Sequence, residues 1–327
     1  MIKCFCFFIV VLQSLIFVSG FKCEFEKSTV LEHQYICRTL PASSEIIETH
    51  LLEKTDNDVN NVVFNGTVHA KSHFAASDFQ FNERFPNLSS IYVYGVSTID
   101  ENAFQKYEHL DEIWITDTDI EDLPEKLFSS CTKLTAILIT DNKIKTLPEN
   151  IFVNNQELTY LRLDNNQINY LPPNIFKSLI NLEMLFLEEN NLQTLHPALF
   201  ESLGKLTSIN LYSNKITDLP KNIFSSLENK KQIYLGDNQL TTIHSDSFGN
   251  IERKTEIRFN NNKIIAIDEK LIDDTDISMI DMTNNICSQE LIEIRIQIKE
   301  KLRKCFDNYK PREVLKLFWT HSKIIMD

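Results

Sequence analysis

Few residues of this sequence have the types and spacing that catalysis or metal binding would require. His69 and His73 are four residues apart, so on a helix they could present two imidazoles to one metal ion. No third ligand accompanies them, and we expect no metal site. Cys131 has no nearby histidine to activate it, and we expect its thiol to be buried. The six glycines form no phosphate-binding loop, so we predict no cofactor, no catalytic residue and no enzyme activity.

A second group of residues could bind a ligand rather than react with one. Its members are mostly aromatic, and they recur at outward positions of short alternating segments. The group consists of Tyr92, Tyr94, Trp114, Leu138, Tyr160, Arg162, Met184 and Phe186. On neighbouring strands these side chains would form an exposed patch, and such patches mark interfaces. The alternative without function is that aromatic residues suit strands in general.

A further set of residues, one directly after each of these segments, is acidic at four of its positions. It consists of Asp117, Asp141, Asn165, Glu189, Ser213, Asp237, Asn261 and Asn284. The ordinary interpretation is a solvated rim, and the functional alternative is a surface for a basic partner. Arg162 and Arg258 stand among these acids, so internal ion pairs would weaken the attraction for such a partner.

The elements that must position these residues repeat with a period of 24 residues, as the stretch 158–181, LTYLRLDNNQINYLPPNIFKSLIN, illustrates. One asparagine column consists of Asn142, Asn166, Asn190, Asn214, Asn238 and Asn262, followed by Asn285. A phenylalanine column consists of Phe104, Phe128, Phe152, Phe176, Phe200, Phe224 and Phe248. The alternating LxL segment predicts a short strand, and one such unit cannot bury its apolar face alone. A period of this length therefore indicates a solenoid, in which each asparagine amide bonds the backbone of its own and the neighbouring turn.

The pattern LxxLxLxxNxL followed by xxLPxxxF resembles the leucine-rich repeats of extracellular animal proteins, over roughly residues 59–287. The resemblance implies an α/β solenoid, a leucine-rich repeat horseshoe with a parallel inner sheet and an irregular convex side. It also implies recognition of another protein through the concave face.

The chain divides into five predicted segments. We expect a signal peptide, a hairpin cap with strands near Lys22–Phe25 and Gln34–Leu40, an array of about ten coils, a helical cap, and a tail. These cover residues 1–20, 21–50, 51–287, 288–305 and 306–327. Helical spacing of Leu291, Ile294, Ile298 and Leu302 predicts the second cap. The apolar tail could be a further packed helix, or a helix for dimerisation or a membrane surface.

Five cysteines remain after removal of the leader, and four of them form close pairs at the two ends of the array. In an oxidising compartment these pairs predict the disulfides Cys23–Cys37 and Cys287–Cys305. Cys131 occupies a column of buried leucines, so we expect a free thiol that acts as a small hydrophobe. An intermolecular disulfide is the alternative.

Charge and processing signals restrict the partners. The formal net charge of −13, without a basic run, argues against nucleic acid and against anionic membranes. No integral membrane segment is expected after cleavage of the signal peptide. Asn65 and Asn87 begin Asn-X-Thr and Asn-X-Ser motifs and are candidate glycosylation sites.

The N-terminal cap and the array resemble those of secreted insect leucine-rich repeat proteins, some of which serve innate immunity. The resemblance implies a secreted protein that binds another extracellular protein or a microbial component. Two alternatives are an organiser of extracellular matrix, similar to small leucine-rich proteoglycans, and an inhibitor of a secreted enzyme. The sequence leaves open whether the chain forms a homodimer or a heterodimer.

Overall fold

The computed structural model describes the backbone of nine stretches and the side chains of four. The backbone is described for residues 2–6, 21–26, 34–39, 61–65, 73–74, 87–251, 254–273, 277–292 and 295–311. Side chains are described for residues 87–251, 254–272, 277–290 and 300–311. The chain forms two compact units, residues 1–167 (unit 1) and 168–327 (unit 2), and each is described by itself.

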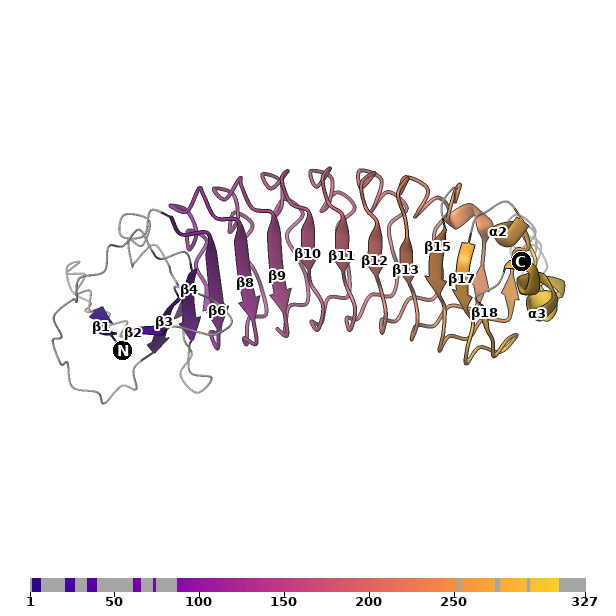
Figure 1. The fold of residues 1–327 in the computed structure, drawn as a ribbon, viewed down its shortest axis with the longest axis horizontal. Coiled ribbons are helices and arrows are strands. Elements are labelled where there is room, and N and C mark those ends of the chain that lie inside the picture. Colours follow the sequence, from indigo (N-terminus) through magenta and orange to yellow (C-terminus); the bar gives the residue numbers. More distant parts are fainter. Residues whose placement is uncertain are drawn as a thin grey trace, which may run out of the picture. The chain divides into compact units, whose positions relative to one another are not determined.

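Unit 1 contains a sheet whose strands follow the order of the chain (Figure 1). The strands are β1 (Ile2–Cys6), β2 (Phe21–Glu26), β3 (Gln34–Thr39), β4 (Asn61–Asn65), β6 (Ser90–Tyr94), β8 (Glu112–Thr116), β9 (Ala136–Thr140) and β10 (Tyr160–Arg162). Pairs β1–β2 and β2–β3 are antiparallel, and every later pair is parallel. Strands β5 (His73–Phe74) and β7 (Thr98–Ile99) form a separate parallel pair. His73 therefore lies in a strand and not in the helix that the metal-site hypothesis would require. His69 lies outside the described residues.

Unit 2 continues the same repeat with β11 (Met184–Phe186), β12 (Ser208–Asn210), β13 (Gln232–Tyr234), β15 (Thr255–Arg258) and β17 (Ile277–Asp281) as parallel neighbours. The coil between β15 and β17 has 23 residues instead of 24, and the register shifts between Thr255 and Glu256. A second parallel pair, β14 (Thr242–Ile243) and β16 (Ala266–Ile267), lies outside this sheet. Short helices η3 (Ser245–Ser247) and α2 (Lys270–Asp273) interrupt the return segments.

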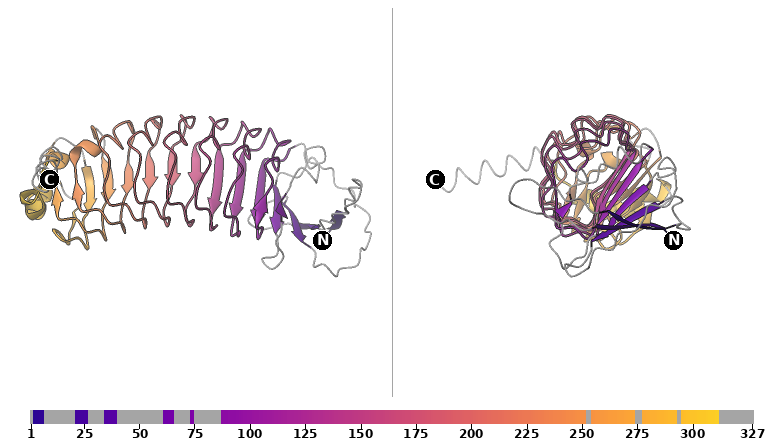
Figure 2. Two further views of the ribbon diagram at one scale, coloured as in Figure 1. Left: turned by 180° about the vertical axis from the view of Figure 1, so that it is seen from behind. Right: turned by 90° about the vertical axis from the view of Figure 1, so that its left-hand side faces the viewer.

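In each unit the strands occupy one side of the coil and turn-rich return segments occupy the other (Figure 2). The phenylalanine column fills the interior, as predicted. Phe128 is fully buried, and its ring centroid lies 6.1 Å from those of Phe104 and Phe152. In unit 2 the Phe200 ring stacks at 6.3 Å from Phe176 and 6.0 Å from Phe224. The repeating interior confirms the predicted fold class, a solenoid with a parallel sheet.

The asparagine column bonds the backbone of two adjacent coils, as predicted. In unit 2 the Nδ2 of Asn238 donates to the carbonyl of Leu211 in the preceding coil at 2.9 Å, and also to that of Leu235 in its own coil. Its Oδ1 accepts the N–H of Ile216 at 2.9 Å. In unit 1 Thr118 replaces asparagine; its hydroxyl donates to Asn142 Oδ1 and accepts the N–H of Ile120 at 3.2 Å. The hydroxyl group of Thr118 thus satisfies a turn that lacks the asparagine.

The acidic column has a conformational cause that sequence reasoning missed. In unit 1 Asp117, Asp141 and Asn165 have φ of 54°, 56° and 52°, and Gly95 occupies the same place in the preceding coil with φ of 62°. In unit 2 the column members Glu189, Ser213, Asp237, Asn261 and Asn284 also have positive φ. Asp, Asn and Gly enter this left-handed region most easily, so backbone geometry selects most of these residues. Nothing in the structure explains the choice of glutamate at position 189.

The N-terminal hairpin forms at the predicted place, with β2 and β3 antiparallel and Cys23 opposite Cys37 in register. The side chains of these cysteines, and with them the predicted disulfide, lie outside what the structure describes, as does most of the predicted signal peptide. Asn65 pairs in register with Tyr94, and Asn87 has an exposed side chain.

The C-terminal cap contains the predicted disulfide Cys287–Cys305, with an S–S distance of 2.10 Å. Cys305 lies in α3 (Arg295–Asp307). The prediction that Leu291 belongs to this helix is wrong, because Leu291 lies in β18 (Leu291–Ile292), which pairs antiparallel with β17. This pairing covers the hydrogen-bonding edge that β17 would otherwise expose, and edge protection outweighs the helical spacing of the side chains.

Cys131 is a buried free thiol, as predicted, and burial raises its pKa to about 12. The next coil of unit 1 carries Asn155 in the same column. Its Nδ2 donates to the carbonyls of Phe128 at 3.2 Å and Cys131 at 2.9 Å. In the described part of the chain, no helix combines the length and apolar character of a membrane-spanning helix.

Candidate ligand-binding face

The sheet of each unit has one face toward the phenylalanine interior and one face away from it, which we call the open face. In β8 the side chains alternate, with Ile113 and Ile115 buried in the interior and Trp114 between them on the open face. Register places Tyr92 and Leu138 beside Trp114, and Arg162 beside Leu138. In unit 1 this middle column therefore brings four of the predicted residues onto adjacent strands, as expected.

Trp114 is the centre of the open face in unit 1. Its half-buried indole lies 5.2 Å from the Tyr92 ring, with the ring planes inclined by 36°. The indole Nε1–H donates to Glu112 Oε2 at 3.2 Å. A tilted ring contact on one side and a hydrogen bond on its own strand hold the indole in one orientation, while part of its surface stays accessible.

Two of the residues predicted to be exposed are buried. Tyr92 retains 6% and Leu138 5% of their accessible surface. Adjacent strands are only about 4.8 Å apart. The indole of Trp114 is wider than this spacing, so it covers part of Tyr92 and Leu138 on the strands at its two sides. The accessible aromatic surface of unit 1 is therefore narrower than predicted and rests on half-buried Trp114, Tyr160 and Tyr94.

Arg162 is committed to an internal ion pair. Its Nε and Nη2 each donate to one carboxylate oxygen of Asp164 at 2.7 Å. The Asp164 side chain is only 1% exposed, whereas that of Arg162 is 35% exposed. The two-bond geometry fixes the guanidinium and neutralises it, so Arg162 presents a flat, oriented edge rather than a free positive charge.

The pKa values of Tyr92 and Tyr94 are both raised, so these two phenols stay protonated through the physiological range. Burial raises the pKa of Tyr92, and the charge of Glu112 raises it further, against a smaller opposing effect of a hydrogen bond with Ser90. Burial and then the charge of Asp117 raise the pKa of Tyr94. Both hydroxyl groups thus remain neutral and can donate hydrogen bonds.

The open face of unit 2 is more polar. Met184, with 39% of its surface exposed, and half-buried Phe186 lie on β11, so these two predicted residues belong to unit 2. Further along the unit, the guanidinium of Arg258 lies 4.9 Å from the centroid of the Tyr234 ring. Arg258 Nε also donates to Glu256 Oε1 at 2.5 Å.

Glycine at position 236 leaves room for an aromatic ring on this face of unit 2. A Cβ at Gly236 would lie 2.9 Å from two ring carbons of Tyr212 and 2.5 Å from Asn260 Oδ1. The ring of Tyr212 can therefore pack against the backbone of the neighbouring coil only because position 236 has no side chain.

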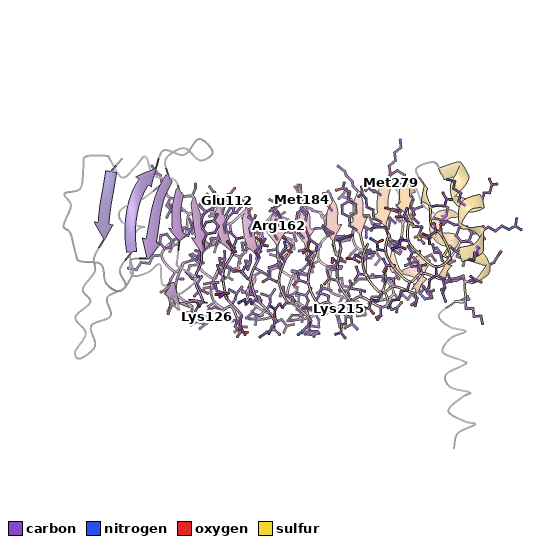
Figure 3. The ribbon with its side chains drawn as sticks, turned by 90° about the horizontal axis from the view of Figure 1, so that it is seen from below. Glu112, Lys126, Arg162, Met184, Lys215 and Met279 are labelled. Atoms are coloured by element: carbon purple, nitrogen blue, oxygen red, sulfur yellow. A yellow bond between two sulfur atoms is a disulfide. The ribbon has the colours of Figure 1, made fainter. Side chains whose placement is uncertain are left out.

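The side chains of each unit separate by face (Figure 3). In unit 1 Glu112 and Arg162 project from the strand side and Lys126 from the opposite side. In unit 2 Met184 and Met279 project from the strand side and Lys215 from the opposite side. Sequence reasoning missed Glu112 and Asp164, which orient Trp114 and Arg162. Their spacing in the sequence could have revealed both partners, because residues two apart on a strand lie on the same face.

Within the described residues, no group of three or more His, Cys, Asp or Glu side chains is arranged to hold a metal ion. The open face carries rings, amides and paired charges. This arrangement is suited to binding a partner by contact.

Comparisons with known proteins agree with the repeat geometry. A family model described as leucine rich repeat matches residues 108–168, 156–216 and 204–264. No curated protein sequence matches the chain.

Three solved structures share the fold. The TLR13–ssRNA13 complex has a TM-score of 0.59 at 16% identity and covers 72% of this chain and 37% of its own. The APL1 leucine-rich repeat domain has a TM-score of 0.51 at 17% identity and covers 77% of both chains. The LRIM1/APL1C complex has a TM-score of 0.52 at 16% identity and covers 80% of this chain and 55% of its own. The chain thus spans only about two fifths of the first structure, and identities this low show the fold alone. The matched family model and the stacked parallel coils show that residues 108–264 form leucine-rich repeats.

Proposed function

We propose that this chain is a secreted leucine-rich repeat protein that binds another extracellular protein through the open face of its sheet, in innate immunity. The observation that carries the proposal is Trp114, an accessible indole held in place by the Tyr92 ring and by Glu112. Rigid aromatic anchors of this kind dominate protein interfaces, because they bury a large area and lose little conformational freedom on binding.

The surroundings of Trp114 support a protein ligand. The neighbouring positions carry buried Leu138 and half-buried Tyr160, and Arg162 in the same column is neutralised by Asp164. An apolar centre bordered by paired charges is the usual anatomy of a protein interface. The N-terminal leader pattern and the disulfide Cys287–Cys305 support an extracellular location.

The role in immunity is suggested by likeness alone. LRIM1 and APL1C form a complex in the structure that resembles this chain, and TLR13 was solved with ssRNA13. The net charge of −13 disfavours RNA as a ligand here, so the proposal retains a protein partner.

The test is a capture experiment from extracellular fluid with the secreted full chain, followed by affinity measurements on each captured protein. Trp114→Asp is the binding variant. Tyr170→Asp is the matched control, because Tyr170 is an exposed aromatic residue that does not lie on a strand of the open face. Circular dichroism establishes that both variants are folded.

We expect Trp114→Asp to weaken the partner's binding by roughly 30-fold or more, as for a residue that contributes about 2 kcal/mol or more to an interface. Tyr170→Asp should bind as the unaltered protein does. Equal binding by all three proteins would remove the open face of unit 1 as the binding surface.

A further inference from the structure

The open face of unit 2 binds a cation of its own chain. Tyr234 on β13 lies beside Arg258 on β15 in the sheet register, and Glu256 precedes Arg258 by two residues on the same strand. The guanidinium carbon of Arg258 lies 4.9 Å from the centroid of the Tyr234 ring, and Arg258 Nε donates to Glu256 Oε1 at 2.5 Å. A ring and a carboxylate on adjacent strands thus hold one guanidinium group, by stacking and by a charged hydrogen bond.

Unit 1 repeats the tyrosine and the glutamate but not the cation. Tyr92 on β6 lies beside Trp114 on β8, and Glu112 precedes Trp114 by two residues. Relative to this tyrosine and this glutamate, Trp114 has the position that Arg258 has in unit 2. Glu112 projects from the strand side of unit 1 (Figure 3), and its Oε2 accepts the indole N–H at 3.2 Å. The indole is neutral, so this bond does not cancel the charge of the carboxylate.

The charge of Glu112 has no counter-ion in the described part of the chain. None of the lysine and arginine side chains described there forms an ion pair with it. Arg162, in the same column as Trp114, is already paired with Asp164 through two hydrogen bonds. Glu112 therefore leaves a negative charge beside the indole.

The two tyrosines respond to this difference. Burial raises the pKa of Tyr234 and the charge of Glu256 raises it further, whereas the positive charge of Arg258 lowers it. Burial and then the charge of Glu112 raise the pKa of Tyr92, and no described cation opposes them. The electrostatic environment of unit 1 thus lacks the positive charge that unit 2 supplies from its own sequence.

A partner can reach both groups that would receive a cation. The side chains of Trp114 and Glu112 are half-buried, so each keeps accessible surface on the open face. A guanidinium is planar, weakly hydrated and able to donate several hydrogen bonds in one plane, so it can contact a ring and a carboxylate together. The formal net charge of −13 also favours the approach of a basic surface.

We propose that the partner of the open face inserts an arginine side chain here, with its guanidinium stacked on the Trp114 indole and hydrogen-bonded to Glu112. The arginine of the partner would supply to unit 1 the cation that Arg258 supplies to unit 2. This inference rests on the function proposed above and adds the chemistry of the partner.

A small arginine peptide tests the site without the natural partner. The full chain carrying Trp319→Phe reports the fluorescence of Trp114 alone, because the chain has two tryptophans. At low ionic strength, acetyl-Gly-Arg-Gly-amide should change this emission in a saturable way. The same peptide with citrulline in place of arginine keeps the shape and loses the charge, so it should bind about tenfold more weakly. Equal binding by the two peptides would overturn the proposal.

Glu112→Gln removes the charge and keeps an oxygen that can accept the indole N–H. The emission without peptide should therefore stay the same, and the affinity for the arginine peptide should fall about tenfold. Glu157→Gln is the matched control, because Glu157 is an exposed residue of unit 1 that lies in a turn and not on a strand of the open face. It should leave the affinity unchanged. An unchanged affinity in Glu112→Gln would also overturn the proposal.

The captured partner separates this inference from the function on which it rests. Glu112→Gln should weaken binding of the partner about tenfold, and Glu157→Gln should not. If Trp114→Asp abolishes binding of the partner and Glu112→Gln leaves it unchanged, the arginine contact is wrong and the function stands. If the arginine peptide binds as expected but Trp114→Asp leaves binding of the partner unchanged, the chemistry of the site stands and the proposed function is wrong.

Discussion

In unit 1 the middle column of the open face carries Tyr92, Trp114, Leu138 and Arg162, whereas in unit 2 the same column carries Phe186, Asn210, Tyr234, Arg258 and Asp281. The interiors of the two units show no such contrast, since both stack phenylalanines about 6 Å apart and both bond carbonyls through the asparagine column. Stacking requires the same residue at each level of the interior. The open face has no such requirement, so its residues can differ between units.

The largest expected effect tests whether the two interiors are equivalent. Phe128→Ala in unit 1 and Phe200→Ala in unit 2 each remove a fully buried ring with stacked neighbours on both sides. Each should lower the free energy of unfolding by about 3–5 kcal/mol, because the ring leaves a cavity between fixed coils. Urea denaturation followed by circular dichroism measures the loss. A loss below 1 kcal/mol in one unit alone would end the equivalence.

The next effect separates the ion pairs of the two open faces. Asp164→Asn breaks a two-bond pair with a buried carboxylate and should cost about 1.5–3 kcal/mol. Glu256→Gln breaks a more exposed pair with Arg258 and should cost about 0–1 kcal/mol. The same denaturation experiment ranks them. Equal costs would mean that burial does not distinguish the two pairs.

The asparagine columns should behave alike in the two units. Asn142→Ala and Asn238→Ala each leave buried carbonyls without donors, and each should cost about 1–3 kcal/mol. Because the two sites share no partners, the double variant should lose the sum of the single losses. A double loss clearly different from the sum would reveal coupling between the units.

The smallest effect is an alkaline loss of stability that involves Cys131 and does not occur at neutral pH. Burial raises the pKa of its thiol from 9.0 to about 12, so the folded protein favours the neutral form. The resulting stability is fully present below pH 9 and is lost as pH rises from 9 toward 12. Cys131→Ala should remove this part of the alkaline destabilisation. In the native protein at pH 8, a thiol reagent should modify Cys131 only on the unfolding timescale, and rapid modification would contradict its burial.

The interior could be predicted from the sequence because it repeats. Phe128 and Asn166 each stand in a column, and each meets the same residue type one coil away. The open face was predictable only in outline. The alternation of β8 placed Trp114 outward correctly, but the burial of Tyr92 and Leu138 depends on how far a neighbouring indole extends across the sheet. Leu291 was misassigned because helical spacing alone does not reveal an unpaired strand edge that the segment can cover.

By itself, the sequence determined the coil, its period, the strand positions and the C-terminal disulfide, because each depends on residue type at a fixed spacing. The tertiary structure decided which outward residues remain accessible, which acids serve left-handed turns, and which charges pair. Accessibility depends on side chains that are 22–24 residues apart in the chain but adjacent in space, and on the volume and orientation of each neighbour. A one-dimensional pattern identifies such neighbours, but only the folded coil fixes how they pack and how much surface each leaves to a partner.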